Sequence, residues 1–394
     1  MGNDIHADSP RIPAKNGGLR LLIGVVCTGA GAAIIFNILP IFLGSAAEDF
    51  QLTDKATGLL GSIYLSGFGI ASVISVLWIN KLSWRLAVCI SFFAAAFLLF
   101  LVSSLNSYQS IAATLFATGC ATGSIYSLSF VLAGEFENSQ RAVGIKLAGE
   151  VLFGSLMLLL LPIYIIPQFG FRGITVVLAI IMMILLSSML CVPHGTGKIV
   201  PEQQRHDKFS STSIKLTLIG LFIFIIGQSA IWSFAERIGV RSGFSGSDIG
   251  IALSVAVLLG AAGSFLAAYV SDRFGKIKPM LLALAMYLLS LLLFSNADSF
   301  WIYALAINVF FFTWLFALPF LISIIATVDI HGRFSTLVSA CIAFGSMTGP
   351  AFAGALVRGT DFTAVYFSCA GVTVIAYIIF VMVSAGTRPE RLSD

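Results

Sequence analysis

The chain has 394 residues, of which 58% are hydrophobic and only 10% are charged. A soluble domain carries about 25% charged residues, so this composition excludes a soluble globular protein. The formal net charge is +4 and no basic cluster stands out, which argues against a nucleic-acid partner.

Apolar segments of about 20 residues, the length that crosses a bilayer as a helix, follow one another along the whole chain. Helices are expected because backbone polar groups in lipid must be satisfied internally, and the two-residue alternation of a membrane barrel is absent. The segments lie at about 20–43, 56–79, 85–104, 109–133, 143–166, 173–193, 214–235, 248–270, 278–295, 299–327, 334–357 and 363–385. The predicted fold class is therefore an all-α membrane protein with twelve transmembrane helices.

Polar stretches divide these segments into two sets of six. Residues 1–19 and 386–394 are predicted to be tails, and residues 194–213 form a polar linker with too few apolar residues for a domain of its own. The expected domains are thus two six-helix bundles, at 20–193 and 214–385.

An internal repeat relates the two bundles. Gly58 corresponds to Gly250 at an offset of 192, and the run that begins at Phe153 corresponds to the run that begins at Phe344 at an offset of 191. Glu150 has an uncharged counterpart, Cys341, at the same local offset. Membrane proteins built from two such halves usually bind their ligand between them.

The placement of lysine and arginine predicts how the chain is oriented in the membrane. With both termini on the inner side, 17 of the 22 basic residues fall on that side, and Lys146 is counted among them. Because basic residues concentrate in cytoplasmic loops, the termini are expected to be cytoplasmic. The expected location is the plasma membrane, and a bacterial inner membrane in particular.

Of all the acidic residues, Glu150 has the deepest predicted position in the membrane. It follows Arg141 by nine residues, or roughly 13 Å along a helix, which places it within the hydrocarbon. A carboxyl group there must face a cavity, pair or be protonated, and a protonatable buried carboxyl suits proton coupling. The alternative is a structural, hydrogen-bonded glutamate. Glu236 is expected only at the outer end of its segment, where solvated interfacial charges are favoured over a gate pair with Arg237.

The arrangement of six plus six helices around a central linker, with a basic loop after the second and eighth segments, resembles the major facilitator superfamily. The most specific element is Asp272-Arg273-Phe274-Gly275-Lys276, which is similar to the superfamily's Asp-Arg-x-Gly-Arg/Lys loop, although Ala268 replaces its leading glycine. The first-half copy is degraded, with Asn80 in place of the aspartate.

The resemblance implies roles for particular residues. The loop would lock one access state, with Asp272, Arg273, Gly275, Lys276 and Arg333 as gating residues, and Gly275 would need positive φ. The first, fourth, seventh and tenth helices would line the substrate cavity, although single polar residues in such helices more often bond a neighbouring helix. The cavity candidates are Asn37, Ser124, Tyr126, Ser127, Gln228, Trp232, Asn308 and Trp314.

The predicted function is secondary transport of a small organic solute by alternating access, coupled to protons through Glu150. Since no deep arginine or lysine is expected, a neutral, cationic or amphipathic solute is favoured over phosphates and dicarboxylates, and efflux is slightly favoured over uptake. A non-transporting sensor and a membrane-embedded enzyme are the other classes. No cysteine or histidine cluster has metal-ligand spacing, and no phosphate loop is present. We therefore expect no metal, no cofactor and no enzyme activity, and a monomer whose partners are solute, proton and lipid.

Overall fold

The structure is a computed structural model that describes residues 18–79, 81–193, 212–328 and 335–386. The predicted tails, most of the linker, Asn80 and Arg333 lie outside these ranges. Eleven helical stretches in the described part are long and apolar enough to span a membrane, and one of them, Ser139–Cys191, covers two of the predicted segments. The predicted all-α membrane fold is confirmed.

The first bundle contains helices that follow the predicted segments within a few residues, with short irregular turns between some of them. Its elements are α1 (Gly18–Asn37), α2 (Leu39–Asp49), α3 (Asp54–Ile74), η1 (Ser75–Leu77), α4 (Trp84–Ser104), α5 (Tyr108–Gly134), α6 (Ser139–Leu160), η2 (Leu161–Ile165), α7 (Ile166–Leu186) and η3 (Ser187–Cys191). The second bundle contains α8 (Thr212–Arg241), α9 (Gly246–Phe274), α10 (Ile277–Ser295), α11 (Phe300–Val328), α12 (Ser335–Leu356) and α13 (Thr363–Gly386).

The first predicted span is broken. α1 ends at Asn37, α2 begins at Leu39, and Pro40 occupies the first turn of α2. Proline has no backbone N–H to donate and its ring clashes with a continuing helix, so Pro40 accounts for a helix break at this position. After the break, α2 packs against α8 of the other bundle.

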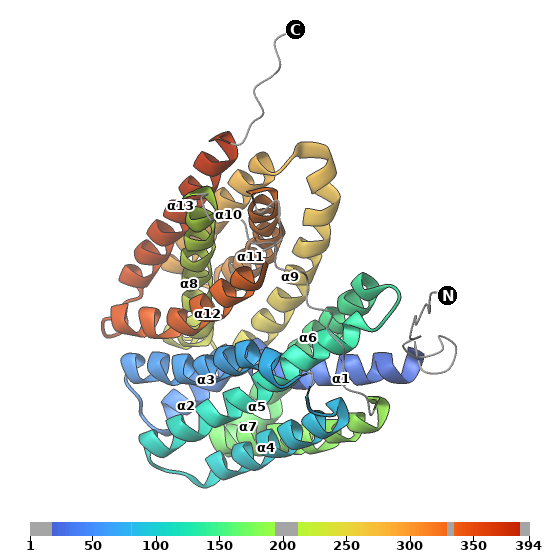
Figure 1. The fold of residues 1–394 in the computed structure, drawn as a ribbon. Helices are drawn as coiled ribbons and strands as arrows, with labels where there is room; N and C mark the ends of the chain where they lie inside the picture. Colours follow the sequence, from blue (N-terminus) through green and yellow to red (C-terminus); the bar gives the residue numbers. More distant parts are fainter. Residues whose placement is uncertain (1–17, 80, 194–211, 329–334, 387–394) are drawn as a thin grey trace, which may run out of the picture.

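The two bundles meet at one end and diverge towards the other (Figure 1). Since the spans alternate in direction, α1 begins and α13 ends on the same side, which we call the termini side, and we call the opposite side the far side. The bundles splay apart towards the termini side, and their mutual contacts described below lie in the far halves of the helices.

Close backbone contact between α3 and α12 joins the bundles on the far side. A methyl group on Gly58 would overlap the backbone carbonyl of Pro350, and one on Gly354 would overlap the backbone carbonyl of Asp54. One turn further on, the Ala351 N–H donates to Ser62 Oγ at 2.9 Å. Glycine is what permits backbones to approach this closely inside a membrane.

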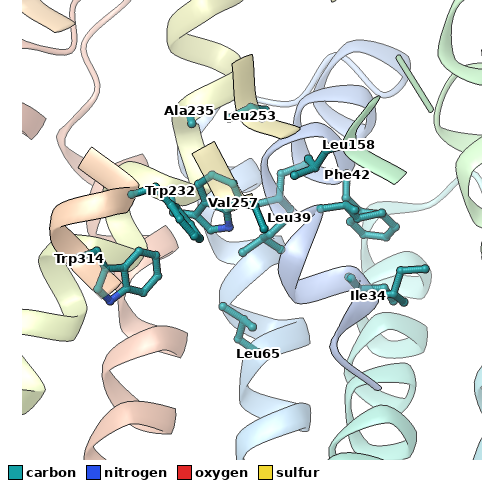
Figure 2. Packing of buried hydrophobic residues seen from close by; sticks show 14 of the residues in the cluster. Ile34, Leu39, Phe42, Leu65, Leu158, Trp232, Ala235, Leu253, Val257 and Trp314 are labelled. Atoms are coloured by element: carbon teal, nitrogen blue, oxygen red, sulfur yellow. The ribbon is translucent and has the colours of Figure 1, made fainter. Parts of the chain in front are cut away.

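A second contact joins α6 to α9 in the same way. The hydroxyls of Ser155 and Ser254 lie 2.8 Å apart, and Gly250 leaves room for the carbonyl of Leu158. Between the two contacts, apolar side chains from both bundles form one buried cluster around the α1–α2 break, with Leu39, Trp232 and Val257 close together (Figure 2). The far side is therefore sealed by packed surfaces from both halves.

We expect Gly58→Ala to open the far side, because the new methyl meets backbone atoms of Pro350 that cannot rotate away. The readout is the distance between spin labels on Ser107→Cys and Thr360→Cys, which are exposed far-side positions of the two bundles, in a chain without the six native cysteines. The label distance should lengthen. Gly144→Ala is the control, since Gly144 has open space around it. An unchanged distance in Gly58→Ala would show that this contact does not set the closure.

Candidate functional site

A buried ion pair occupies the middle of the first bundle. Lys146 Nζ lies 2.6 Å from the Glu150 Oε1 atom one turn along α6, and the two side chains are 0% and 7% exposed. The spacing of four residues places both on one face of the helix. The sequence counted Lys146 only as one of the inner-side charges, whereas its side chain is buried within the bundle.

Aromatic rings and a glycine enclose this pair. Lys146 Nζ lies 4.2 Å from the centre of the Tyr126 ring and 3.5 Å from that of Phe130, both on α5. On the other side, α1 approaches at Gly29, where a methyl group would meet the Glu150 carboxylate and the Lys146 stem. Cation–π contacts contribute about 2 kcal/mol when desolvated. The Lys146 ammonium is therefore stabilised both by the Glu150 carboxylate and by the two aromatic rings.

The expectation that no cation lies deep in the chain is therefore wrong. A buried ion pair is stable only while both partners carry charge, and removing one leaves the other uncompensated. Protonation of Glu150 would leave Lys146 without a counter-ion.

The cavity candidates of the first bundle divide into two groups. Asn37 donates from Nδ2 to the backbone carbonyl of Glu150 at 3.1 Å, and Tyr126 faces Lys146, so both belong to the surroundings of the pair. Ser124 bonds the carbonyl of Cys120 in its own helix, and Ser127 bonds the carbonyl of Ser72 on α3. The hydroxyls of these two serines serve helix hydrogen bonds.

The candidates of the second bundle centre on stacked aromatic rings. The ring centres of Trp232 and Phe311 are 4.5 Å apart, and those of Phe311 and Trp314 are 5.3 Å apart. Trp232 donates from Nε1 to the carbonyl of Phe36 on α1 at 3.4 Å and so bridges the bundles, whereas Trp314 Nε1 has no partner among the described residues. Figure 2 shows Trp314 beside Trp232 at this junction.

Two side-chain amides in the same bundle, those of Gln228 and Asn308, have carbonyl oxygens that accept no hydrogen bond from the described residues. Gln228 is fully buried and contacts the Thr373 hydroxyl at 3.5 Å, and Asn308 donates to the carbonyl of Ala304. The Oε1 of Gln228 and the Oδ1 of Asn308 accept no hydrogen bond within the described part of the chain.

A shallow hollow of about 510 Å³ lies between α8 and α12, towards the termini side, and its wall is almost entirely apolar. Its lining includes Leu218, Phe222, Leu337, Cys341, Phe344 and Thr348. Leu337 and Cys341 are the positions that the 191-residue offset relates to Lys146 and Glu150. The halves therefore place a charged pair and an apolar hollow at equivalent positions.

A second ion pair crosses between the bundles on the far side. Arg241, at the end of α8, donates from Nη2 to both oxygens of Asp54 on α3, at 2.8 and 2.7 Å. Arg237 Nη2 lies 3.7 Å from the same carboxylate, and the Arg241 guanidinium stacks 4.9 Å from the Phe362 ring. These side chains are only 14–17% exposed, so this cluster is a partly buried clamp on the far side.

Glu236 also differs from the sequence expectation of a solvated interfacial charge. Its side chain is buried, with 8% of the residue exposed, and it fits against Gly44 of α2. Arg237 points to Asp54, so it forms no ion pair with its neighbour Glu236.

The gating loop lies partly outside the described residues. α9 ends at Phe274 and Gly275 has φ of 68°, which confirms the left-handed turn predicted there. Lys276 donates to the Ser323 carbonyl on α11 at 3.0 Å, and Arg273 stacks on the Tyr269 ring. The side chain of Asp272 and all of Arg333 are not described.

Comparison with known proteins gives the family and the fold. The model described as Major Facilitator Superfamily matches residues 21–216 and again 217–393. A variant of the nucleoside transporter NupG has a similar structure, with a TM-score of 0.74 at 15% identity over 93% of this chain and 100% of that one. A bacterial homologue of the human lysosomal transporter Spinster, inward-facing and occupied, gives 0.71 at 14% identity over 93% and 96%. A search of curated protein sequences gave no match.

Sequence reasoning missed Lys146, Asp54 and Arg241 as functional residues. The signal for Lys146 was present, because a lysine four residues before a glutamate in one apolar segment indicates a pair on one helix face. The Asp54–Arg241 pair joins residues 187 positions apart, and no local pattern predicts it.

We expect Glu150→Gln to destabilise the protein by about 3–5 kcal/mol, because it strands the buried ammonium of Lys146. The double variant Lys146→Met/Glu150→Gln should recover most of that loss, since it removes both charges. The measurement is the unfolding midpoint in detergent. Glu135→Gln, at an exposed position, is the matched control and should change little. Equal stability of the single variant and the parent protein would contradict a charged pair.

Proposed function

Because the chain belongs to the Major Facilitator Superfamily, we propose that it moves a small organic solute across the membrane by alternating access. Membership makes the protein an integral membrane transporter and not an enzyme. The finer proposal is proton-coupled uptake of an amphipathic organic anion. The observation that carries it is the buried Lys146–Glu150 pair.

The bundle arrangement supports a state that is closed on the far side. Backbone contacts between α3 and α12 and the Asp54–Arg241 clamp hold the bundles together there, while they diverge towards the termini side. With the termini placed in the cytoplasm by the basic-residue bias, this is an inward-facing state. We place the protein in the plasma membrane, as a monomer of two six-helix domains at 20–193 and 214–385 joined by the linker.

Exchange of partners at Lys146 couples proton and solute. Glu150 takes up the proton as an anionic group of the solute replaces its carboxylate beside Lys146. Because the two events are concerted, the ammonium is never left unpaired in a low-dielectric site, where such a charge would cost several kcal/mol. One proton and one monoanion enter together, so the cycle moves no net charge. The reverse exchange on the cytoplasmic side frees the solute and restores the pair.

The apolar surroundings favour an amphipathic solute. The hollow around Cys341 and the aromatic group at Trp232, Phe311 and Trp314 offer surface for an apolar body, while Lys146 offers the one buried ammonium of the described chain. The sequence argument for efflux assumed a cavity without a deep cation. With Lys146 present, symport of an anion with an inward proton is the better-supported direction, and efflux is the alternative.

We expect at least one aromatic or aliphatic carboxylate in a defined panel to raise the thermal stability of the purified protein. The protective effect should grow as the pH falls, because Glu150 must be protonated. In Glu150→Gln, binding should persist without that pH dependence, and an imposed pH gradient should no longer accelerate uptake of the same carboxylate into proteoliposomes. Lys146→Met should abolish binding. Stabilisation by neutral or cationic compounds alone would overturn the anion proposal, and undiminished gradient-driven uptake by Glu150→Gln would remove Glu150 from coupling.

The loop after α9 is proposed as the gate of the termini side, through Asp272, Arg273, Lys276 and Arg333. Asp272→Asn should change the labelling of a cysteine introduced at Ser139, an exposed termini-side position, and change far-side labelling at Ser107→Cys in the opposite sense. Asp248→Asn, at the other end of α9, is the control. Unchanged labelling on both sides would show that the loop has no gating role and only sets the membrane topology.

A further inference from the structure

Glu236 is a buried carboxyl group that the transport cycle proposed above does not use. It lies on α8 where that helix meets α2 of the other bundle, and a methyl group on Gly44 would overlap its carboxylate. The residue is 8% exposed, and its Oε2 atom has no hydrogen-bond partner in the described ranges. A carboxyl group therefore fills the interface between the halves, and within the described ranges it forms no ion pair.

Arg237 attracts the Glu236 carboxyl group through space but is oriented to Asp54, and the other charged or titratable groups near it are engaged elsewhere or of the same sign. Arg237 and Arg241 of α8 both turn to Asp54 of α3. Glu48 of α2 is an exposed acid whose charge disfavours a second anion, and Asp49 accepts from the Phe171 N–H. Tyr303 of α11 donates its hydroxyl to the Ala235 carbonyl. None of these groups gives Glu236 the ion pair that an ionised buried carboxylate needs.

An ionised carboxylate that is buried without a partner costs several kcal/mol, and such a group takes up a proton instead. We infer that Glu236 is a proton-binding site, and that its protonation holds the far side closed. Ionisation would introduce a bare negative charge against the backbone at Gly44, beside the acid Glu48. Charge at this position is compatible only with a state in which α2 and α8 separate and water reaches the carboxylate.

Proton binding by Glu236 and closure of the far side favour each other. The closed far side binds the proton more tightly than the open one, so acid favours closure and rising pH favours opening. For one proton the ratio of open to closed molecules changes by at most about tenfold per pH unit. Glu236 lies at the far side near the exposed Glu48, so we assign its proton exchange to the far-side solution and its role to regulation of access, apart from Glu150. The inference rests on the alternating access of the proposed function, but on neither its solute nor its coupling site.

The test is a pH titration of the spin-label distance between Ser107→Cys and Thr360→Cys, without any solute, in lipid nanodiscs. In the parent chain the long-distance population should grow as the pH rises. Glu236→Gln, which mimics the protonated group, should keep the short distance at every pH. Glu135→Gln, at an exposed position, and Glu48→Gln should retain the pH response. A pH response that survives in Glu236→Gln, or that is lost in Glu135→Gln or Glu48→Gln, would overturn the inference.

A second pair of variants separates this role from a folding defect. Gly44→Ala should force the bundles apart on the far side, because its methyl overlaps the Glu236 carboxyl group. Adding Glu236→Ala should restore the short distance and leave it independent of pH. Persistent opening in the double variant would show that Gly44 acts through another contact, and would contradict the inference. Loss of carboxylate uptake with an intact pH titration would instead concern only the proposed function.

Discussion

The rest of the structure depends on one constraint: a charge between these helices must have a counter-charge in every state that is populated. Lys146 has Glu150 and two aromatic rings, and Asp54 has Arg241 and Arg237. Glu236 has no such partner in the described chain. In a medium where an unpaired ion costs several kcal/mol, each of these arrangements restricts the charge states that the packed helices can hold.

Glycine makes the charged sites possible by letting backbones come together around them. Gly29 admits the Lys146–Glu150 pair, Gly44 admits Glu236, and Gly58 brings α3 against α12 next to the Asp54 clamp. Inside a membrane, helices associate through this close packing because the lipid offers no hydrophobic drive between them. The same contacts that seal the far side therefore position its ionisable groups.

The order of the helices could be predicted because it depends on the local length of apolar segments. The depth of Glu150 could be predicted from its distance to the loop. The rotation of α6 could not, so Lys146 was counted only among the inner-side charges and the cavity was described without a cation. The partner of Asp54 and the burial of Glu236 depend on how two bundles dock, and that information is spread over residues nearly 200 positions apart.

The central claim is that closure of the far side is one half of a working cycle. A reversible cross-link between Ser62→Cys on α3 and Ala351→Cys on α12, which are joined by a hydrogen bond in this structure, tests it in a chain without native cysteines. The account predicts that oxidation stops carboxylate uptake into proteoliposomes and that a reductant restores it, while each single-cysteine variant is unaffected. Uptake at the full rate by the cross-linked protein would contradict the account.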